Sequence, residues 1–217
     1  MNMRTTTMIL LACLLTACAG GKGVQMISKV PGLEGLQLDP VGLDGEQLAI
    51  VDQIDPSDRG AINVIRIAQN ASINMVEIAR DGGRSTYMSA SRRGVVLNNG
   101  ILSQTQGVGG DLAGSKHEIT RLRTTGKVFT KVHTSLGGDD RIHSETFRCI
   151  RTARPVDYFG LDENRRLLQP IDEVCSNENR KHENVYFLYP GTDRVFRSRQ
   201  WVSEQIGYFR IEQVKLP

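Results

Sequence analysis

The sequence lacks both a long hydrophobic run and an excess of charge of either sign. Its longest apolar run, Met8 to Ala19, is well short of the roughly 20 residues that span a bilayer, so we predict no transmembrane helix. The formal net charge is only +3, and the 27 basic and 24 acidic residues are interspersed. This even distribution removes the main electrostatic argument for nucleic-acid binding.

Aromatic residues are also scarce, at 6% of the chain, and proline is ordinary, at seven residues. The composition fits neither a disordered chain nor a collagen-like one. With 217 residues, of which 39% are hydrophobic and 24% charged, the chain is long enough to bury a sizeable core. We predict a globular protein.

Motifs of common catalytic and cofactor sites are missing as well. The glycine-rich segment 107–111 has no Lys-Ser/Thr of a phosphate-binding loop, and Leu112 stands where a dinucleotide fingerprint needs its third glycine. No Gly-x-Ser-x-Gly occurs, and the four histidines have no zinc-site spacing. Nothing selects two carboxylates for glycoside hydrolysis. We therefore predict a protein that is not an enzyme and that has no cofactor or metal.

The N-terminal segment has the features of a bacterial lipoprotein signal. Arg4 precedes the apolar run, which ends in Leu-Thr-Ala before Cys18, a pattern that resembles a lipobox. We expect residues 1–17 to be removed and Cys18 to carry the lipid anchor. The next residue is Ala19 rather than aspartate, which in enterobacterial-type sorting favours the outer membrane.

Two cysteines remain after the signal segment and the lipidated residue are set aside. In an oxidising periplasm, Cys149 and Cys175 are expected to form a disulfide, although two separate buried thiols are the alternative. Neither has a second cysteine or a histidine at metal-site spacing.

Residues 18–60 are rich in glycine and proline and show no sustained period, which predicts a flexible tether and an irregular segment. Residues 61–217 are expected to form a single all-β domain, because short β-like runs are separated by turn residues. The expected strands are 62–68, 73–80, 85–91, 95–97, 101–105, 128–136, 141–150, 184–189, 194–202 and 207–214.

Helices are expected to be few and short, with 46–52 and 162–168 as candidates. In two of the strands polar and apolar residues partly alternate, which predicts one buried and one solvated face. The fold class predicted from these patterns is all-β, with an antiparallel meander.

Two sets of side chains are candidates for contact with a ligand. His133 would face His143 directly across a three-residue hairpin loop, whereas a four-residue loop would place them on opposite faces. Arg197, Arg199 and Trp201 alternate along one strand and are therefore candidates for contact with a glycan or a partner. The alternative is an edge strand with solvated arginines and a tryptophan packed on the core.

The stretch from Tyr87 to Leu112, YMSASRRGVVLNNGILSQTQGVGGDL, resembles the central signature of the YjbF/GfcB family of lipoproteins. Segments 198–203 and 207–212 resemble the C-terminal end of that family, and the lipobox also fits it. The likeness covers most of residues 60–214. Tyr87 stands where many members have tryptophan.

This resemblance implies a large antiparallel sheet folded on itself into a partly open barrel. It also implies an outer-membrane lipoprotein of exopolysaccharide or group 4 capsule production, with a periplasmic partner and an outer-membrane β-barrel partner. No catalytic residue comes with the family.

We therefore expect a lipid-anchored, non-enzymatic accessory protein of polysaccharide export that faces the periplasm and touches no nucleic acid. The second hypothesis is a periplasmic module that binds lipid or an acylated partner in an apolar concavity. An enzyme acting on polysaccharide is the third.

Overall fold

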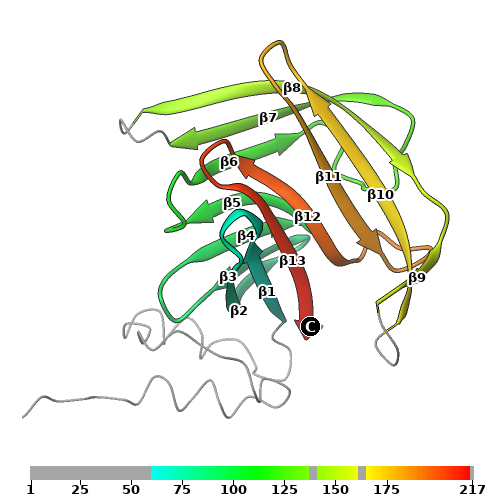
Figure 1. Cartoon of the computed structure of the whole chain (residues 1–217), viewed down its shortest axis with the longest axis horizontal. Coiled ribbons are helices and arrows are strands. Elements are labelled where there is room, and N and C mark those ends of the chain that lie inside the picture. The colour runs from blue at the N-terminus through cyan, green and yellow to red at the C-terminus, as the bar shows by residue number, and fades with distance from the viewer. Residues whose placement is uncertain (1–59, 137–140, 161–164, 216–217) are drawn as a thin grey trace, which may run out of the picture.

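The computed structural model describes residues 60–136, 141–160 and 165–215, which form an antiparallel β-sheet curled into a barrel (Figure 1). The described strands are β1 (Ala61–Arg66), β2 (Ala71–Asp81), β3 (Arg84–Met88), β4 (Gly94–Asn98), β5 (Ile101–Gln106), β6 (Leu112–His117), β7 (Val128–Leu136), β8 (Ile142–Ala153), β9 (Asp157–Phe159), β10 (Arg166–Ser176), β11 (Lys181–Leu188), β12 (Val195–Ser203) and β13 (Gly207–Lys215). One short 3₁₀ helix, η1 (Ile67–Gln69), follows β1. Within these described ranges no helix is both long and apolar enough to cross a bilayer.

The order of the strands confirms the predicted fold class. Hydrogen-bonded neighbours run β5-β4-β3-β2-β1-β13-β12-β11-β10-β8-β7-β6, and β9 pairs only with β10. The first and last strands, β1 and β13, therefore pair in the middle of the sheet. The barrel is partly open because no strand ladder joins β5 to β6, which are the two ends of this order.

Side chains bridge the seam between β5 and β6. The side-chain amide of Gln104 donates to the carbonyl of Ala113 at 2.9 Å, and the backbone N–H of Leu112 donates to Thr105 Oγ1 at 2.9 Å. Asp111 accepts from the hydroxyl of Thr105 at 3.0 Å and so closes the turn between the two strands. The barrel is thus held shut here by polar side chains rather than by a main-chain ladder.

Local sequence explains the hairpins between consecutive strands. Asn99 and Gly100, which connect β4 to β5, both have positive φ, at 49° and 79°. Two such residues are what a tight two-residue hairpin turn requires, and asparagine and glycine are the residues that adopt positive φ most readily. Gly100 is required for a second reason, because a Cβ there would lie 2.4 Å from Val195 Cγ2 of β12.

Among the described residues, three apolar clusters fill the interior of the barrel. The largest of these lies among β1–β6, β12 and β13 and includes Ile62, Met75 and Phe209. A second contains Leu122, Tyr186 and neighbours, and the third surrounds Cys149 and Cys175. Burial alternates along the strands, as in β7, so one face of the sheet supplies the core.

The predicted strands match the observed ones within a few residues, and three strands were missed. These are β6, β9 and β10. The expected helix at 162–168 is wrong for its described part, because 166–168 begins β10 and pairs with β9. The candidate helix at 46–52 lies outside the described residues, as do the signal peptide, Cys18 and the tether.

Candidate functional site

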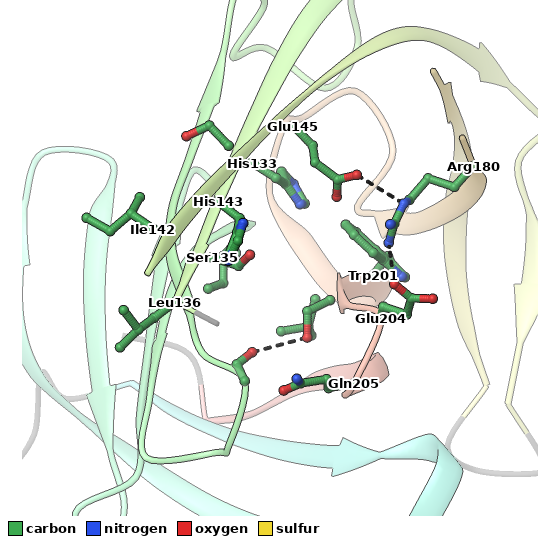
Figure 2. A pocket seen from close by; sticks show the side chains of 15 residues that line it. His133, Ser135, Leu136, Ile142, His143, Glu145, Arg180, Trp201, Glu204 and Gln205 are labelled. Atoms are coloured by element: carbon green, nitrogen blue, oxygen red, sulfur yellow. Dashed lines mark hydrogen bonds and ion pairs between the residues drawn. The ribbon is translucent and has the colours of Figure 1, made fainter. Parts of the chain in front are cut away.

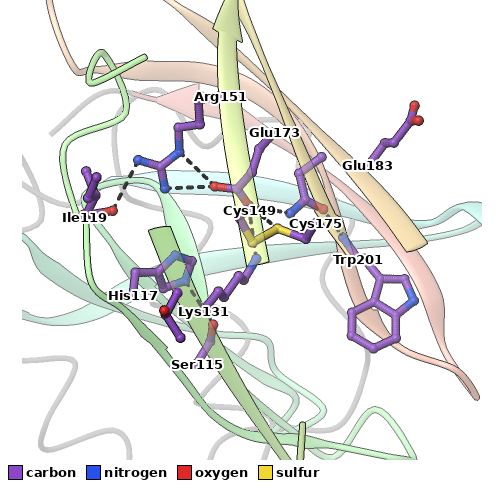
Figure 3. Close-up of a disulfide and its surroundings, with 12 residues drawn as sticks. Ser115, His117, Ile119, Lys131, Cys149, Arg151, Glu173, Cys175, Glu183 and Trp201 are labelled. Carbon is purple, nitrogen blue, oxygen red and sulfur yellow. Dashed lines mark hydrogen bonds and ion pairs between the residues drawn. A yellow bond between two sulfur atoms is a disulfide. The ribbon is translucent and has the colours of Figure 1, made fainter. Parts of the chain in front are cut away.

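Cys149 and Cys175 form a disulfide that joins two neighbouring strands (Figure 3). They are direct partners in the register of β8 and β10, with a Cα–Cα distance of 4.1 Å. Both side chains are buried and pack with Phe129 and Phe147. The two cysteines are 26 positions apart in the sequence, and their bond links β8 covalently to β10 in the barrel wall.

Beside the disulfide, a buried carboxylate is surrounded by polar partners (Figure 3). Glu173 of β10 is fully buried and forms ion pairs with Lys131 at 3.1 Å and with Arg151 at 2.8 Å. Asn184 donates to the same carboxylate at 2.8 Å, and the hydroxyl of Tyr186 lies at 3.4 Å. These five residues, which we call the buried charge cluster, come from four strands.

The cluster fixes the ionisation of its members. Burial alone would raise the pKa of Glu173, but the charges of Lys131 and Arg151 outweigh it and hold that pKa well below its ordinary value. Burial lowers the pKa of Lys131, and Glu173 partly opposes that change. Glu173 carries the only negative charge in the cluster, and it faces two positive charges. Its carboxylate therefore reduces the repulsion between Lys131 and Arg151.

Arg151 also connects the cluster to the segment between β6 and β7. Its guanidinium donates to the carbonyls of Ile119 and Arg121 at 3.2 and 2.9 Å, and it stacks over Phe129 at 4.5 Å. The segment contributes Leu122 to the core. One buried arginine thereby holds a loop, a strand and a carboxylate together.

Three histidines point toward the interior and are kept neutral by burial. We call His117, His133 and His182 the interior histidines. Burial and the nearby charge of Lys131 lower the pKa of His117 to about 3 and that of His182 to about 4. The pKa of His133 is lowered well below its ordinary value, first by burial and then by Lys131.

A pocket of about 620 Å³ opens between the β7–β8 hairpin and the β12–β13 turn (Figure 2). Its lining is mainly polar and comes from segments far apart in the sequence. The residues are Gly110, Leu112, His133, Ser135, Leu136, Ile142, His143, Ser144, Glu145, Arg180, Trp201, Val202, Ser203, Glu204 and Gln205.

Trp201 lies on the wall of this pocket, beyond the end of the ladder between β11 and β12. Its pairing with β13 is regular, and the register shifts only after it. The backbone N–H of Trp201 donates to Asn184 Oδ1 at 2.7 Å, and its ring stacks on His182 at 4.5 Å. Gln200 points inward and hydrogen-bonds the backbone of Leu102.

The three residues predicted to share a face of β12 are therefore not brought together. Arg197 and Arg199 lie on the outer face, where they stack over Phe187 at 4.9 Å and Tyr208 at 4.6 Å. Trp201 lies inside, against the core. The position of Trp201 agrees with the alternative interpretation, but that interpretation is wrong about the strand, because β12 pairs with β11 and β13 and is not an edge strand.

The two histidines predicted to face each other across the hairpin are not direct partners. In the register of β7 and β8, His133 is opposite Glu145, and His143 is opposite Ser135. The two histidines share a face but are offset by two positions, so neither loop length considered for this hairpin was correct. Both line the pocket.

Sequence reasoning missed the buried charge cluster. Its charged members lie in three different strands. From the sequence alone, each of these charged side chains would be expected at the surface. The signal that was present is the alternation of β7, which places Lys131 on the same face as Phe129 and His133. Among the described residues, no group of three or more His, Cys, Asp or Glu could hold a metal ion.

Comparisons with known proteins identify similar chains. A family model described as "Group 4 capsule polysaccharide lipoprotein gfcB, YjbF" matches residues 51–214. The crystal structure of the hypothetical lipoprotein YmcC from Escherichia coli K12 is similar, with a TM-score of 0.62 and 14% sequence identity. The alignment covers 79% of this chain and 89% of that one, and at this identity it shows a shared fold. No curated protein matches the chain.

Proposed function

Because the chain belongs to the YjbF family of group 4 capsule polysaccharide lipoproteins, we propose that it is a non-enzymatic accessory component of exopolysaccharide or capsule production and export. In this proposal Cys18 anchors the protein to the outer membrane, and the barrel faces the periplasm. Its partners there are the periplasmic and outer-membrane β-barrel components of the polysaccharide machinery. The observation that carries the proposal is the family match over residues 51–214.

The ionisation of the two buried carboxylates argues against either of them acting as a general acid. A carboxyl group that acts as a general acid near neutral pH needs a raised pKa. For Glu77, burial acts to raise the pKa, but hydrogen bonds from Arg80 and other groups lower it. Glu173 is shifted in the same direction by Lys131 and Arg151. Both carboxylates are tied into ion pairs that stabilise the fold.

The second hypothesis, an apolar carrier for lipid, is less well supported. Such a carrier needs an apolar concavity large enough for an acyl chain. In the described barrel, interior positions are taken by the three apolar clusters and the buried charge cluster. The pocket of Figure 2 is lined mainly by serine, histidine and charged side chains.

The proposal is tested by deleting the gene and measuring cell-bound and released exopolysaccharide. We expect the deletion to lower the polysaccharide, the wild-type gene to restore it, and Cys18→Ser to fail although the protein is present. Cys13→Ser is the matched control, because it makes the same substitution within the segment expected to be removed. This control should restore polysaccharide as the wild type does.

Two results would overturn the proposal. If the deletion leaves the polysaccharide unchanged, the protein has no role in its production. If Cys18→Ser restores polysaccharide as fully as Cys13→Ser, anchoring through Cys18 is not needed.

A further inference from the structure

The pocket between the β7–β8 hairpin and the β12–β13 turn contains a buried polar group with no partner. His133 is 4% exposed, lines the pocket, and has no hydrogen-bond partner for Nδ1 or Nε2 among the described residues. Leaving buried polar atoms without a hydrogen bond costs free energy. A ligand in the pocket would remove this cost by bonding to the ring.

The chemistry of His133 restricts that ligand. A neutral imidazole offers one N–H donor and one acceptor nitrogen. Burial and the charge of Lys131 keep the ring neutral, since they hold the pKa of His133 well below its ordinary value. Hydroxyl groups both donate and accept, so a polyhydroxylated ligand can satisfy both nitrogens.

Next to His133, the pocket offers an aromatic surface that is held in place. Trp201 stacks nearly parallel to His133, with ring centroids 5.3 Å apart and an angle of 14°. His182, which does not line the pocket, also stacks on this indole at 4.5 Å and 18°. A rigid indole that is apolar yet carries an N–H suits the C–H face of a sugar ring, whose edge is polar.

The charges at the mouth disfavour an anionic ligand. Arg180 is held between Glu145 at 3.1 Å and Glu204 at 3.2 Å, so its charge is already matched (Figure 2). The charged side chains of the lining are two carboxylates and one guanidinium, and that guanidinium is already paired. A phosphate or a uronic acid would be repelled by these carboxylates. A neutral sugar would not be repelled, and it could form hydrogen bonds with the paired side chains.

We propose that this pocket binds a neutral sugar unit of a polysaccharide, with its hydroxyls on His133 and its ring face on Trp201. The proposal rests on the proposed function, because that function supplies the polysaccharide. It adds a binding site and the chemical class of its ligand. Of the three residues singled out on β12 from the sequence, it retains only Trp201.

The chain provides its own reporter for the test, because Trp201 is the only tryptophan. The full-length protein, purified in detergent, is titrated with neutral oligosaccharides released by mild acid from the exopolysaccharide of the source strain. The acidic fragments, separated by anion exchange, form a second arm. We expect the neutral fraction to change the fluorescence of Trp201 saturably, and the acidic fraction to leave it unchanged.

Two variants separate ligand binding from packing. His133→Phe keeps an aromatic ring against Trp201 but removes both nitrogens, and it should weaken binding at least about tenfold, because both hydrogen bonds to the sugar are lost. His182→Phe is the matched control, because His182 stacks on the same indole without lining the pocket. This control should bind as the wild type does. Thermal unfolding of both variants checks that they are folded.

The proposal is overturned if the wild type shows no saturable change with the neutral fraction, or if His133→Phe binds as tightly as His182→Phe. Binding of the acidic fraction in place of the neutral one would overturn the assigned ligand class. These outcomes are distinct from failure of the proposed function. A pocket that binds nothing in a protein whose deletion still lowers polysaccharide would refute only the site.

Discussion

Removing the charge of Glu173 should destabilise the protein far more than removing that of its neighbour Asp172. Glu173→Gln leaves Lys131 and Arg151 facing each other in the barrel without their shared anion. Breaking a buried ion pair by removing one partner costs about 3–5 kcal/mol. For a domain of this size, that corresponds to a melting temperature lower by about 10 °C or more.

Asp172→Asn is the matched control on the same strand. Asp172 pairs with Arg154 at 2.9 Å, but both side chains are substantially exposed, so the pair contributes less than about 1 kcal/mol. Lys131→Met provides the second comparison. It leaves Glu173 with Arg151, a balanced pair, and should cost less than about 1 kcal/mol or even stabilise the fold.

The assay is urea unfolding of the oxidised protein at neutral pH, with the melting temperature measured in parallel. The reasoning is refuted if Lys131→Met is as destabilising as Glu173→Gln, because the carboxylate would then not be the balancing member of the cluster. Equal effects of Glu173→Gln and Asp172→Asn would also refute it, since burial would then make no difference.

Three further predictions concern pH, the disulfide and the interior glutamine. The interior histidines have folded-state pKa values below 6.5, so acid protonates them more readily in the unfolded chain than in the folded protein. The free energy of unfolding should therefore fall between pH 6.5 and 5, by about 1 kcal/mol per pH unit for each histidine. Urea unfolding between pH 6.5 and 5 measures this change, and a free energy of unfolding that does not depend on pH would contradict it. The control is His143→Gln, which replaces a histidine outside this group of three. Replacing Cys149 and Cys175 by serine should lower the free energy of unfolding by up to about 3–4 kcal/mol, the closure entropy of this loop, with reduced wild type as comparison. Gln200→Ala should cost about 1–3 kcal/mol in the same assay, because the buried N–H of Leu102 loses its acceptor, and an unchanged stability would contradict this.

Much of the fold follows from local sequence, because strand and turn signals lie within a few residues of each other. The alternation in β7 and β13 and the Asn-Asn-Gly turn after β4 are of this kind. β10 was missed because Pro170 and two adjacent carboxylates argue against a buried strand. Its inward carboxylate, Glu173, is tolerated only because partners from β7 and β8 reach it.

The candidate site was less predictable, because it also depends on contacts between residues far apart in the sequence. Trp201 lies beyond the point where the ladder between β11 and β12 ends, and there it stacks on His182. The sequence around Trp201 carries no local signal for the end of that ladder. The offset between His133 and His143 likewise depends on a hairpin register that either side chain alone does not specify.

The pairing of β1 with β13 has a consequence for the way the chain assembles. A polypeptide emerges from the ribosome with its N-terminal end first, so β1 can complete its pairing only after β13 has been made. The meander from β2 to β5 has local contacts, whereas the main-chain ladder that joins the two halves of the sheet needs this last hairpin. Folding of the barrel is therefore post-translational. A chain truncated before Gly207 would lose the strand that joins both halves and should be degraded.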